Sequence, residues 1–460
     1  MKKLIMAVLA IGVLVAAFLF ISPPLNRNVQ SDLPDPAEDS AEMPPEETAE
    51  PLFYDGVQVD ENTSAIALNA DSSVEELAAL ADELTGLTQI DFGTREPSVE
   101  ELSLLNEAFP EAALQYSVAV NGQTYDCGVT ELDFSAMNPA DVDLAAEQIK
   151  KLPALTYVYL GGESENAGAL GFAEVGKFQS ARPDVSYDFS FTIYDKTFST
   201  ADEIIDLNHT WLGDAGEAVK AVLPYMNKCT YLDMDTCGLS NDQMEEIRNA
   251  FPNIKVVWRI NFGSQYSVRT DVEKILASVK GEWLTAENVA PLKYCTDVKY
   301  LDLGHNIIGD ISFVASMPDL EVAVLAINYW SDATPLASCK KLEYLEVFNT
   351  FLSDLSPLAE LTNLKHLNIC WLENVTDITP LYGLTNLERL WIGNMTPIPQ
   401  DQIDTIREKL PNCVINTTTY NPTEEGWREG ERYQLLKEQF GYDEGAYSFY
   451  YLDPKYYPQS

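Results

Sequence analysis

The sequence predicts an α/β solenoid, with a parallel β-sheet on its concave face and helices and 3₁₀ turns on its convex face. Three observations lead to this fold class: an apolar pattern that recurs at a fixed period, alternation of apolar and other residues within it, and a proline-containing return after each turn. One unit this short cannot bury its apolar side alone, so neighbouring units have to stack on each other.

The recurring pattern lies between residues 297 and 413. Blocks 297–318, 319–340 and 341–362 hold 22 residues each, and block 363–385 holds 23. Each block opens with an apolar residue, two others, a second apolar residue, one more and a third apolar residue. The residues at these positions are Val298, Leu301, Leu303, Leu320, Ala323, Leu325, Leu342, Leu345, Val347, Leu364, Leu367, Ile369, Leu387, Leu390 and Ile392. The alternation predicts a strand, and the fixed period predicts parallel strands side by side.

The turn that leaves each strand carries a polar residue in the first two blocks. Asn306 and Asn328 stand about nine positions into their blocks, where a side-chain amide can satisfy backbone groups of the turn. The later blocks place Thr350 and Leu372 there, so we expect only a partial asparagine ladder.

A second signature follows the turn, as in residues 354–358 and 377–381, which read Asp-Leu-Ser-Pro-Leu and Asp-Ile-Thr-Pro-Leu. Proline fixes φ and lacks an N–H donor, which favours a short 3₁₀ segment over a long helix. Residues 297–413 resemble the leucine-rich repeat family and, in this return, its bacterial internalin-type subclass. The resemblance implies a protein that binds a ligand through its concave face.

Residues 52–293 show a longer and less regular period. Pro110, Pro183 and Pro252 each precede an alternating strand, and they lie 73 and 69 residues apart. Four capping boxes predict helices between the strands. They are Ser73 with Glu76, Ser98 with Glu101, Thr200 with Glu203, and Ser240 with Gln243. The segment is similar to longer repeats of the ribonuclease-inhibitor type, and a separate α/β domain beside residues 294–415 is the alternative.

The N-terminus predicts a membrane tether. Lys2 and Lys3 precede an uncharged apolar run over residues 4–21, which is about 27 Å long as a helix and so close to the ~30 Å hydrocarbon core. We interpret residues 1–25 as a signal-anchor helix, or alternatively a cleaved signal peptide. Residues 26–51 are a Pro-rich acidic linker. The chain is then a bacterial single-pass membrane protein with an extracytoplasmic domain, or alternatively a secreted protein.

Composition and scattered polar residues argue against several kinds of site. The formal net charge of −43 disfavours nucleic acid as a partner. The three histidines are far apart in sequence, and His366 is interpreted as a surface residue. Residues 233–238 imitate the start of a calcium loop but lack its later ligands. The seven cysteines show no CxxC spacing. We therefore predict no enzyme, no metal and no cofactor.

The residues between the apolar positions of each strand point to the concave side, because side chains alternate across a strand. The predicted ligand-binding residues are Tyr300, Asp302, Tyr344, Glu346, Phe348, His366, Asn368, Arg389 and Trp391. Aromatic residues beside charged ones are typical of protein recognition patches, and a solvated face with incidental aromatics is the alternative. We also expect Tyr344→Ala with Trp391→Ala to abolish ligand capture without changing the melting temperature.

The preferred hypothesis is a membrane-tethered extracytoplasmic protein whose concave face binds a protein or cell-envelope ligand. The alternatives are an envelope-associated hydrolase with a site within residues 52–293 and a non-catalytic structural scaffold. Residues 416–460 are rich in aromatics and predict a C-terminal cap over the open end of the solenoid, with Tyr433, Leu436 and Phe440 on one helix face. A binding element is the alternative reading of this segment.

Overall fold

The computed structural model describes residues 51–163, 170–277, 282–394 and 397–440. The described residues from Phe53 onward belong to one compact unit. The apolar run at residues 4–21 and almost all of the acidic linker lie outside the described residues. Within the described ranges, none of the helices combines the length and the apolar character needed to cross a membrane.

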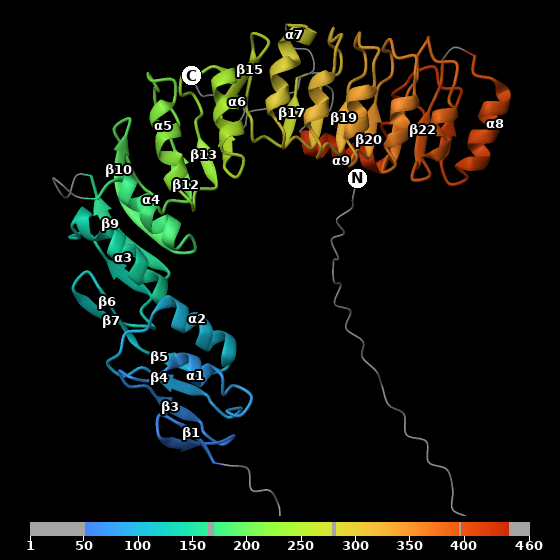
Figure 1. Cartoon of the computed structure of the whole chain (residues 1–460). Coiled ribbons are helices and arrows are strands. Elements are labelled where there is room, and N and C mark those ends of the chain that lie inside the picture. The colour runs from blue at the N-terminus through green and yellow to red at the C-terminus, as the bar shows by residue number, and fades with distance from the viewer. Residues whose placement is uncertain (1–50, 164–169, 278–281, 395–396, 441–460) are drawn as a thin grey trace, which may run out of the picture. The chain divides into compact units, whose positions relative to one another are not determined.

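The predicted 22-residue repeats form the five central strands of a seven-stranded parallel sheet, which β17 and β23 extend on either side (Figure 1). Its strands, in order, are β17 (Lys274–Leu276), β18 (Tyr300–Asp302), β19 (Val322–Val324), β20 (Tyr344–Glu346), β21 (His366–Asn368), β22 (Arg389–Trp391) and β23 (Val414–Asn416). Leu301, Ala323, Leu345, Leu367 and Leu390 are partners in the strand register, and each is fully buried. The predicted α/β solenoid and its apolar spine are therefore confirmed.

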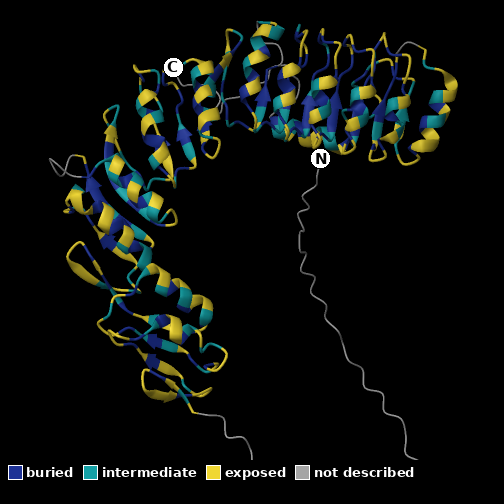
Figure 2. Cartoon of the chain, viewed as in Figure 1, coloured by how far each residue is buried: buried dark blue, intermediate teal, exposed yellow. Residues whose placement is uncertain are grey.

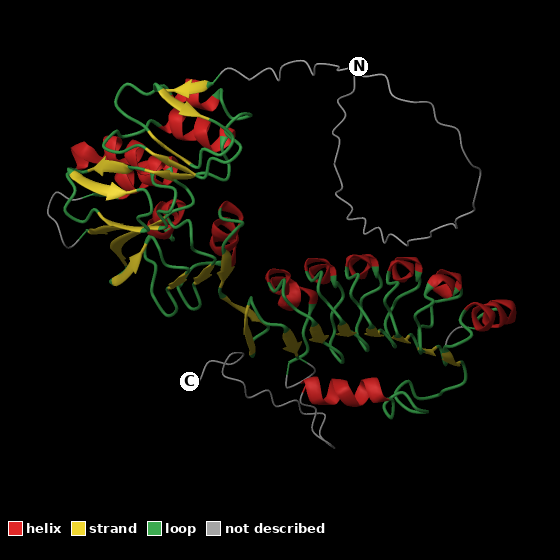
Figure 3. Ribbon diagram, turned by 90° about the horizontal axis from the view of Figure 1, so that it is seen from below, coloured by secondary structure: helices red, strands yellow, loops and turns green. Residues whose placement is uncertain are grey.

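Short 3₁₀ helices lie on one side of this sheet, as the proline-containing returns predict (Figure 3). They are η4 (Ala290–Tyr294), η5 (Ser312–Ser316), η6 (Thr334–Ser338), η7 (Ser356–Glu360) and η8 (Thr379–Gly383). A proline stands in the first turn of η6, η7 and η8. From η5 to η8, an aspartate turns the chain into each helix. Asp332 Oδ1, for example, accepts the N–H of Thr334 at 2.8 Å, and Asp354 Oδ1 accepts that of Ser356 at 2.8 Å.

The partial asparagine ladder is also present. Asn328 Nδ2 donates to the carbonyls of Leu303 at 2.9 Å and Leu325 at 3.1 Å, while its Oδ1 accepts the N–H of Ile308 at 3.0 Å. Asn306 makes the equivalent bonds one repeat earlier. Because both amides are buried, they satisfy backbone groups that water cannot reach.

Within the described residues, the part before β17 contains two three-stranded parallel sheets, one four-stranded sheet with three parallel strands and an antiparallel edge strand, and two-stranded antiparallel hairpins. Its strands are β1 (Leu52–Tyr54), β2 (Val57–Val59), β3 (Ala65–Ala67), β4 (Gln89–Asp91), β5 (Ala113–Gln115), β6 (Ser117–Val120), β7 (Gln123–Asp126), β8 (Glu131–Asp133), β9 (Tyr157–Gly162), β10 (Ser186–Ile193), β11 (Lys196–Ser199), β12 (Ile204–Asp206), β13 (Tyr231–Asp233), β14 (Lys255–Val257), β15 (Arg259–Phe262) and β16 (Tyr266–Arg269). Its helices are α1 (Val74–Ala78), α2 (Val99–Ala108), η1 (Pro139–Asp141), α3 (Val142–Gln148), η2 (Ile149–Lys151), α4 (Phe172–Ala181), α5 (Glu217–Val222), η3 (Leu223–Tyr225) and α6 (Asn241–Ala250). A further short helix, α7 (Ala286–Val289), lies between β17 and η4.

The hairpins explain the longer period of this part. The strand after each of Pro110, Pro183 and Pro252 leads into an antiparallel pair, which is β6 with β7, β10 with β11, and β15 with β16. The capping boxes at Ser98 and Ser240 begin α2 and α6. The helix expected after Thr200 is wrong. Thr200 is fully buried and its hydroxyl accepts the N–H of Phe189, so this threonine holds the hairpin and β12 follows.

The chain after β22 adds α8 (Gln400–Lys409), β23 and α9 (Glu431–Phe440). Figure 3 shows α9 on the side of the strand row opposite the 3₁₀ helices. Leu436 and Phe440 are buried as expected, but they pack with side chains of the strands and not over an open end. The reason is that α8 and β23 already continue the repeats, whereas the aromatic face of the strands would otherwise be left in water.

Burial differs between the strands and the outer elements of the repeats. Figure 2 shows the buried residues concentrated on the strands, while the exposed residues lie on the outer helices and the loops. The largest side chains that are fully buried include Trp258, Trp330 and Trp391. The first two belong to the interior of their repeats, and the third lies on the other side of the strands, under Trp427.

Candidate functional site

The strand face, meaning the side chains of β17 to β22 that point away from the 3₁₀ helices, is covered by residues 417–440, which we name the C-terminal segment. One apolar cluster joins the two parts. It contains Leu276, Val322, Ala326, Tyr344, Phe348, Cys370 and Trp391 from the repeats and Trp427, Leu436 and Phe440 from the C-terminal segment. The predicted concave face therefore carries polypeptide in this structure, and the polypeptide is the chain's own.

Trp427 occupies an aromatic pocket on the strand face. Its ring centroid lies 5.5 Å from that of Tyr344, 6.3 Å from that of His366 and 5.2 Å from that of Trp391. Only 2% of Trp427 is exposed. Aromatic rings at such separations attract each other beyond the area that they bury.

A single carboxylate lies at the base of this pocket. Trp427 Nε1 donates to Glu346 Oε1 at 2.7 Å, and the Tyr344 hydroxyl donates to the same oxygen. Burial raises the pKa of Glu346, although these two hydrogen bonds favour the charged form and lower it. The pocket therefore offers an acceptor to any group that brings an N–H into it.

Side chains of the strand face also bind main-chain carbonyls at every second residue from Tyr420 to Gly426. Trp371 Nε1 donates to the carbonyl of Tyr420 at 3.0 Å, and Asn368 Nδ2 to that of Pro422 at 2.7 Å.

The next two carbonyls of the series are bound from β22. Trp391 Nε1 donates to Glu424 O at 3.3 Å, and Arg389 Nη1 donates to Gly426 O. Near the other end of the face, Lys274 Nζ donates to the carbonyl of Gln439. These donors recognise the backbone of the bound segment, whatever its side chains are.

Two glycines allow the C-terminal segment to approach this closely. A Cβ atom on Gly430 would lie 2.7 Å from Arg389 Nη1, and one on Gly393 would clash with the carbonyl oxygen of Thr419. Gly426 adopts a φ of +93°, which L side chains rarely adopt. The path of the segment over the sheet thus depends on residues that lack side chains.

Helix α9 docks through its apolar side. Leu436 and Phe440 are 0% and 1% exposed, and the Phe440 ring meets that of Tyr300 edge-on at 6.3 Å. Arg432 Nη2 lies 3.5 Å from Glu343 Oε2 and adds an ion pair at the border of the contact. Leu435 points away from the sheet and is 44% exposed.

The structure brings the nine predicted ligand-binding residues onto one face. Seven of them are buried, namely Asp302, Tyr344, Glu346, Phe348, His366, Asn368 and Trp391. Tyr300 and Arg389 are partly exposed and contact Phe440 and Gly426 respectively. Asp302 Oδ1 accepts the N–H of Gly304 at 2.9 Å, within its own turn. Binding of a separate ligand by these residues stays a prediction.

Two expectations about these residues are wrong. His366 is not a surface histidine, since only 7% of it is exposed, and burial with the nearby charge of Arg389 and Arg432 lowers its pKa to about 4. Tyr344 and Trp391 are 1% and 2% exposed. Replacing both with alanine would therefore remove core contacts and lower the melting temperature.

The sequence did not indicate Trp427, Trp371 and Lys274 as members of this site. Trp427 and Glu346 are 81 positions apart, so no local pattern connects them. The available signal was Gly426-Trp427, a large aromatic after a glycine in a stretch without repeat periodicity.

The acidic motif at residues 233–238 has a structural role. Arg269 lies 2.9 Å from Asp233, and Arg259 lies 2.8 Å from Asp235, so both carboxylates are neutralised by guanidinium groups. Across the described residues, no group of His, Cys, Asp and Glu side chains could hold a metal ion. The seven cysteines are all unpaired, and burial raises the pKa of the Cys370 thiol to about 12, which makes it unreactive at neutral pH.

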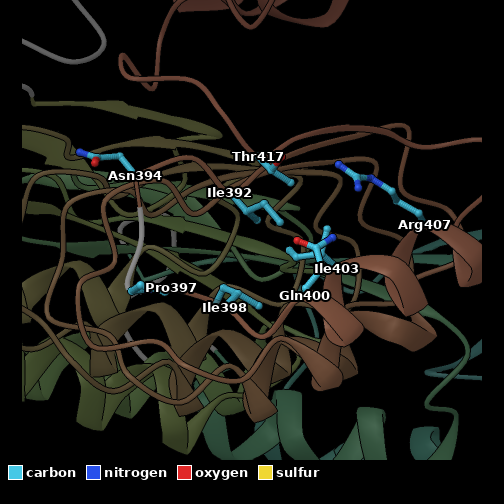
Figure 4. A pocket seen from close by; sticks show the side chains of 8 residues that line it. All are labelled: Ile392, Asn394, Pro397, Ile398, Gln400, Ile403, Arg407 and Thr417. Atoms are coloured by element: carbon cyan, nitrogen blue, oxygen red, sulfur yellow. The ribbon is translucent and has the colours of Figure 1, made fainter.

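A separate pocket of about 260 Å³ lies between the end of β22 and helix α8 (Figure 4). It is lined by Ile392, Asn394, Pro397, Ile398, Gln400, Ile403, Arg407 and Thr417. It contains none of the predicted ligand-binding residues. Arg407 is the charged residue of its lining, and the lining includes no Asp or Glu. We therefore place the candidate site on the strand face.

The register of β17 to β23, the 3₁₀ returns and the asparagine ladder together decide the fold class. The fold is a leucine-rich repeat solenoid. An internalin of Listeria monocytogenes is 16% identical to this chain, covering 79% of it and 84% of the other, with a TM-score of 0.27. A leucine-rich repeat protein of Leptospira interrogans is 17% identical, covering 72% and 90%, with a TM-score of 0.29. Internalin C2 of Listeria monocytogenes is 18% identical, covering 56% and 81%, with a TM-score of 0.26.

No protein-family model matches the chain, and no curated protein matches it. The assignment of the leucine-rich repeat solenoid therefore depends on its own strands and turns, and its function has to be inferred from the strand face.

Proposed function

We propose that this leucine-rich repeat protein is a non-catalytic binding scaffold whose strand face binds a polypeptide segment. One observation carries the proposal: the face holds alternate main-chain carbonyls and a deeply buried indole of the C-terminal segment. A protein ligand presents the same groups, and it would bind where the C-terminal segment now lies.

The chemistry of the face favours polypeptide over other ligands. Its donors are indole, amide and guanidinium N–H groups, which match carbonyl oxygens. Its apolar part is formed by Tyr344, Trp391 and Phe348, which are large anchors of the kind that dominate protein interfaces. The strong negative charge of the chain disfavours polyanionic ligands such as nucleic acid.

The C-terminal segment makes binding competitive. A tethered segment acts at an effective concentration on the order of 1 mM, so a ligand of similar intrinsic affinity succeeds only when it is abundant or makes extra contacts. The apparent affinity of the ligand is reduced by the fraction of molecules in which the face is open. The strand face would therefore bind ligand only above a threshold concentration of that ligand.

The setting that we propose for this binding is the outside of a bacterial cell. Residues 4–21 would anchor the chain in the membrane, and the acidic linker would hold the repeats away from it. The ligand would then be a protein or another polypeptide-containing component of the cell envelope. A secreted form with the same binding face is the alternative.

A peptide added in trans tests the proposal. The chain over residues 51–460 would be prepared with Trp427→Ala, which weakens the C-terminal segment, and a fluorescent peptide of residues 417–440 would be titrated against it. We expect saturable binding, measured by anisotropy, that is at least about tenfold tighter than to the unchanged chain, because the competing segment has lost its anchor.

Two controls complete the experiment. A peptide carrying Trp427→Ala should bind the variant chain weakly, and a chain with Leu435→Ala, whose side chain faces solvent, should bind the normal peptide no better than the unchanged chain. Equal binding of the two peptides, or no saturable binding up to about 1 mM, would contradict a polypeptide-binding strand face.

A further inference from the structure

A row of apolar side chains, three of them exposed, crosses four neighbouring repeats at the turn that follows each strand. The row consists of Trp283, Ile307, Tyr329 and Phe351, and we name it the aromatic row. Its members occupy equivalent positions, because the N–H groups of the next residues, Leu284 and Ile308, are bound by the ladder asparagines Asn306 and Asn328.

The turns that carry the row are in direct contact. The N–H of Tyr329 donates to the carbonyl of Ile308 at 2.9 Å, and the N–H of Phe351 donates to that of Trp330 at 3.1 Å. The rings of Tyr329 and Phe351 lie 5.6 Å apart. The row is thus continuous from one repeat to the next.

The aromatic row does not contribute to the core. Trp283, Tyr329 and Phe351 are 63%, 60% and 54% exposed, whereas the residue after each member is buried and fills the interior. Ile307 is half-buried. Contiguous apolar surface of this kind is uncommon on a soluble face and marks contact sites. The row also lies outside the cluster that the C-terminal segment covers, so among the described residues the cover of the strand face leaves it exposed.

Carboxylates accompany the row three residues later in the chain. Asp310, Asp332 and Asp354 are exposed, and each uses Oδ1 to accept an N–H of its own turn. Asp332 and Asp354 are close enough for their charges to repel each other. In the ranges that the structure describes, none of the three forms an ion pair with a lysine or arginine. The aspartates are needed to hydrogen-bond their own turns, and their negative charge therefore lies beside the row.

The spacing of the row selects the shape of a partner. Neighbouring strands lie about 4.8 Å apart, and an α-helix advances about 5.4 Å per turn. A helix laid across the repeats therefore presents about one apolar side chain to each member of the row. The side chains on one side of a β-strand recur at about 6.6 Å, which does not match the spacing of the row.

We propose that the aromatic row is a docking surface for a basic amphipathic helix of another protein. The apolar stripe of that helix lies on Trp283, Tyr329 and Phe351, and its lysines or arginines meet the carboxylates of Asp332 and Asp354. A glycan is the less suitable occupant, because stacking on a sugar chain needs ring faces that share a plane, and the rings of Tyr329 and Phe351 are inclined by 63°.

The probe is a synthetic peptide of about 18 leucine and lysine residues, with leucine at helical spacing, which is long enough to form a helix on contact. It would be titrated by fluorescence anisotropy at physiological salt against the chain over residues 51–460. We expect Tyr329→Ser with Phe351→Ser to weaken binding by about tenfold or more, as for aromatic anchors of an interface. Asp332→Asn with Asp354→Asn should weaken it by about threefold, and asparagine still caps the turn.

Matched controls separate this surface from general attraction between opposite charges. Leu144→Ser removes an exposed apolar residue of α3, 64% exposed, and should leave the affinity unchanged. A scrambled peptide of the same composition should bind weakly to every form. Equal binding of the two peptides, or an affinity that survives Tyr329→Ser with Phe351→Ser, would overturn the proposal.

Two other occupants are outcomes of the same experiment. Soluble peptidoglycan fragments that bind the unchanged chain and lose binding in the Tyr329→Ser, Phe351→Ser form would replace the helix with a glycan. If Tyr450→Ser with Tyr451→Ser strengthens binding of the probe, the chain's own aromatic C-terminus occupies the row, and the partner in trans is wrong.

Discussion

Replacing Trp427 with phenylalanine removes one hydrogen-bond donor from a buried aromatic pocket and leaves a ring in place. The indole N–H donates to Glu346 at 2.7 Å, and the acceptor is almost fully buried. Leaving a buried acceptor without its hydrogen-bond donor costs about 1–3 kcal/mol. Trp427→Ala removes the ring as well, and truncating a buried tryptophan costs about 3–5 kcal/mol.

Hydrogen exchange of the backbone amides in residues 417–440 measures this loss, because we expect the segment to leave the sheet without unfolding the repeats. About 1.4 kcal/mol corresponds to a factor of ten, so we expect exchange to accelerate by about tenfold to a hundredfold in Trp427→Phe, and more in Trp427→Ala. Amides of β19 to β21 should keep their protection, since each strand is paired on both sides.

The control is Leu435→Ala, whose side chain is 44% exposed on the same segment. It should leave the exchange of residues 417–440 within about threefold of the unchanged chain. The reasoning is refuted if Trp427→Phe exchanges at the normal rate, because Glu346 would then not hold the indole. It is refuted equally if the strands lose protection together with the segment, because the segment would then be inseparable from the solenoid.

Three further predictions concern pH, backbone approach and the ladder. His366 has its pKa lowered to about 4, so its neutral form stabilises the fold above the ordinary pKa of 6.5 and stability falls as pH drops from 6.5 to 4. Urea unfolding should show this fall, and His366→Gln should lack its part of it; an unchanged pH profile would disprove the assignment. Gly430→Ala should push Arg389 aside and speed proteolysis within residues 417–440, and normal resistance would contradict the close approach. Asn328→Leu should cost about 3 kcal/mol in urea unfolding, because it leaves buried backbone groups without partners, and a neutral effect would argue against the ladder.

The repeat core could be predicted because its information is local and periodic. Leu301, Leu345 and Leu367 recur at a fixed interval and are fully buried, so one pattern gives both the strand and the neighbour it pairs with. Asp332 and Asp354 likewise identify the start of each 3₁₀ helix from the sequence alone.

The cover of the strand face could not be predicted in the same way. The alternation of side chains along a strand shows that Tyr344 and Trp391 point away from the repeat core. It does not show which residues pack against them. The partner, Trp427, comes from a segment without repeats. The hairpins between the longer repeats are an intermediate case. Asn121-Gly122, with both residues at positive φ, is a well-known hairpin signal, whereas Tyr194-Asp195 uses the same backbone geometry without that sequence.

The C-terminal segment constrains how many repeats can lie between β17 and β22. Trp427 inserts among β20, β21 and β22, while Phe440 meets Tyr300 of β18 and Gln439 is bound by Lys274 of β17. Between these attachment points the distance along the segment is set largely by α9, which has a fixed rise of about 1.5 Å per residue. Gaining or losing one 22-residue unit between β18 and β20 would change the distance along the sheet by about 4.8 Å and leave one end of the segment out of register. Solenoids can usually lengthen by duplication of a repeat. Here, a repeat added between these attachment points would also require a longer C-terminal segment.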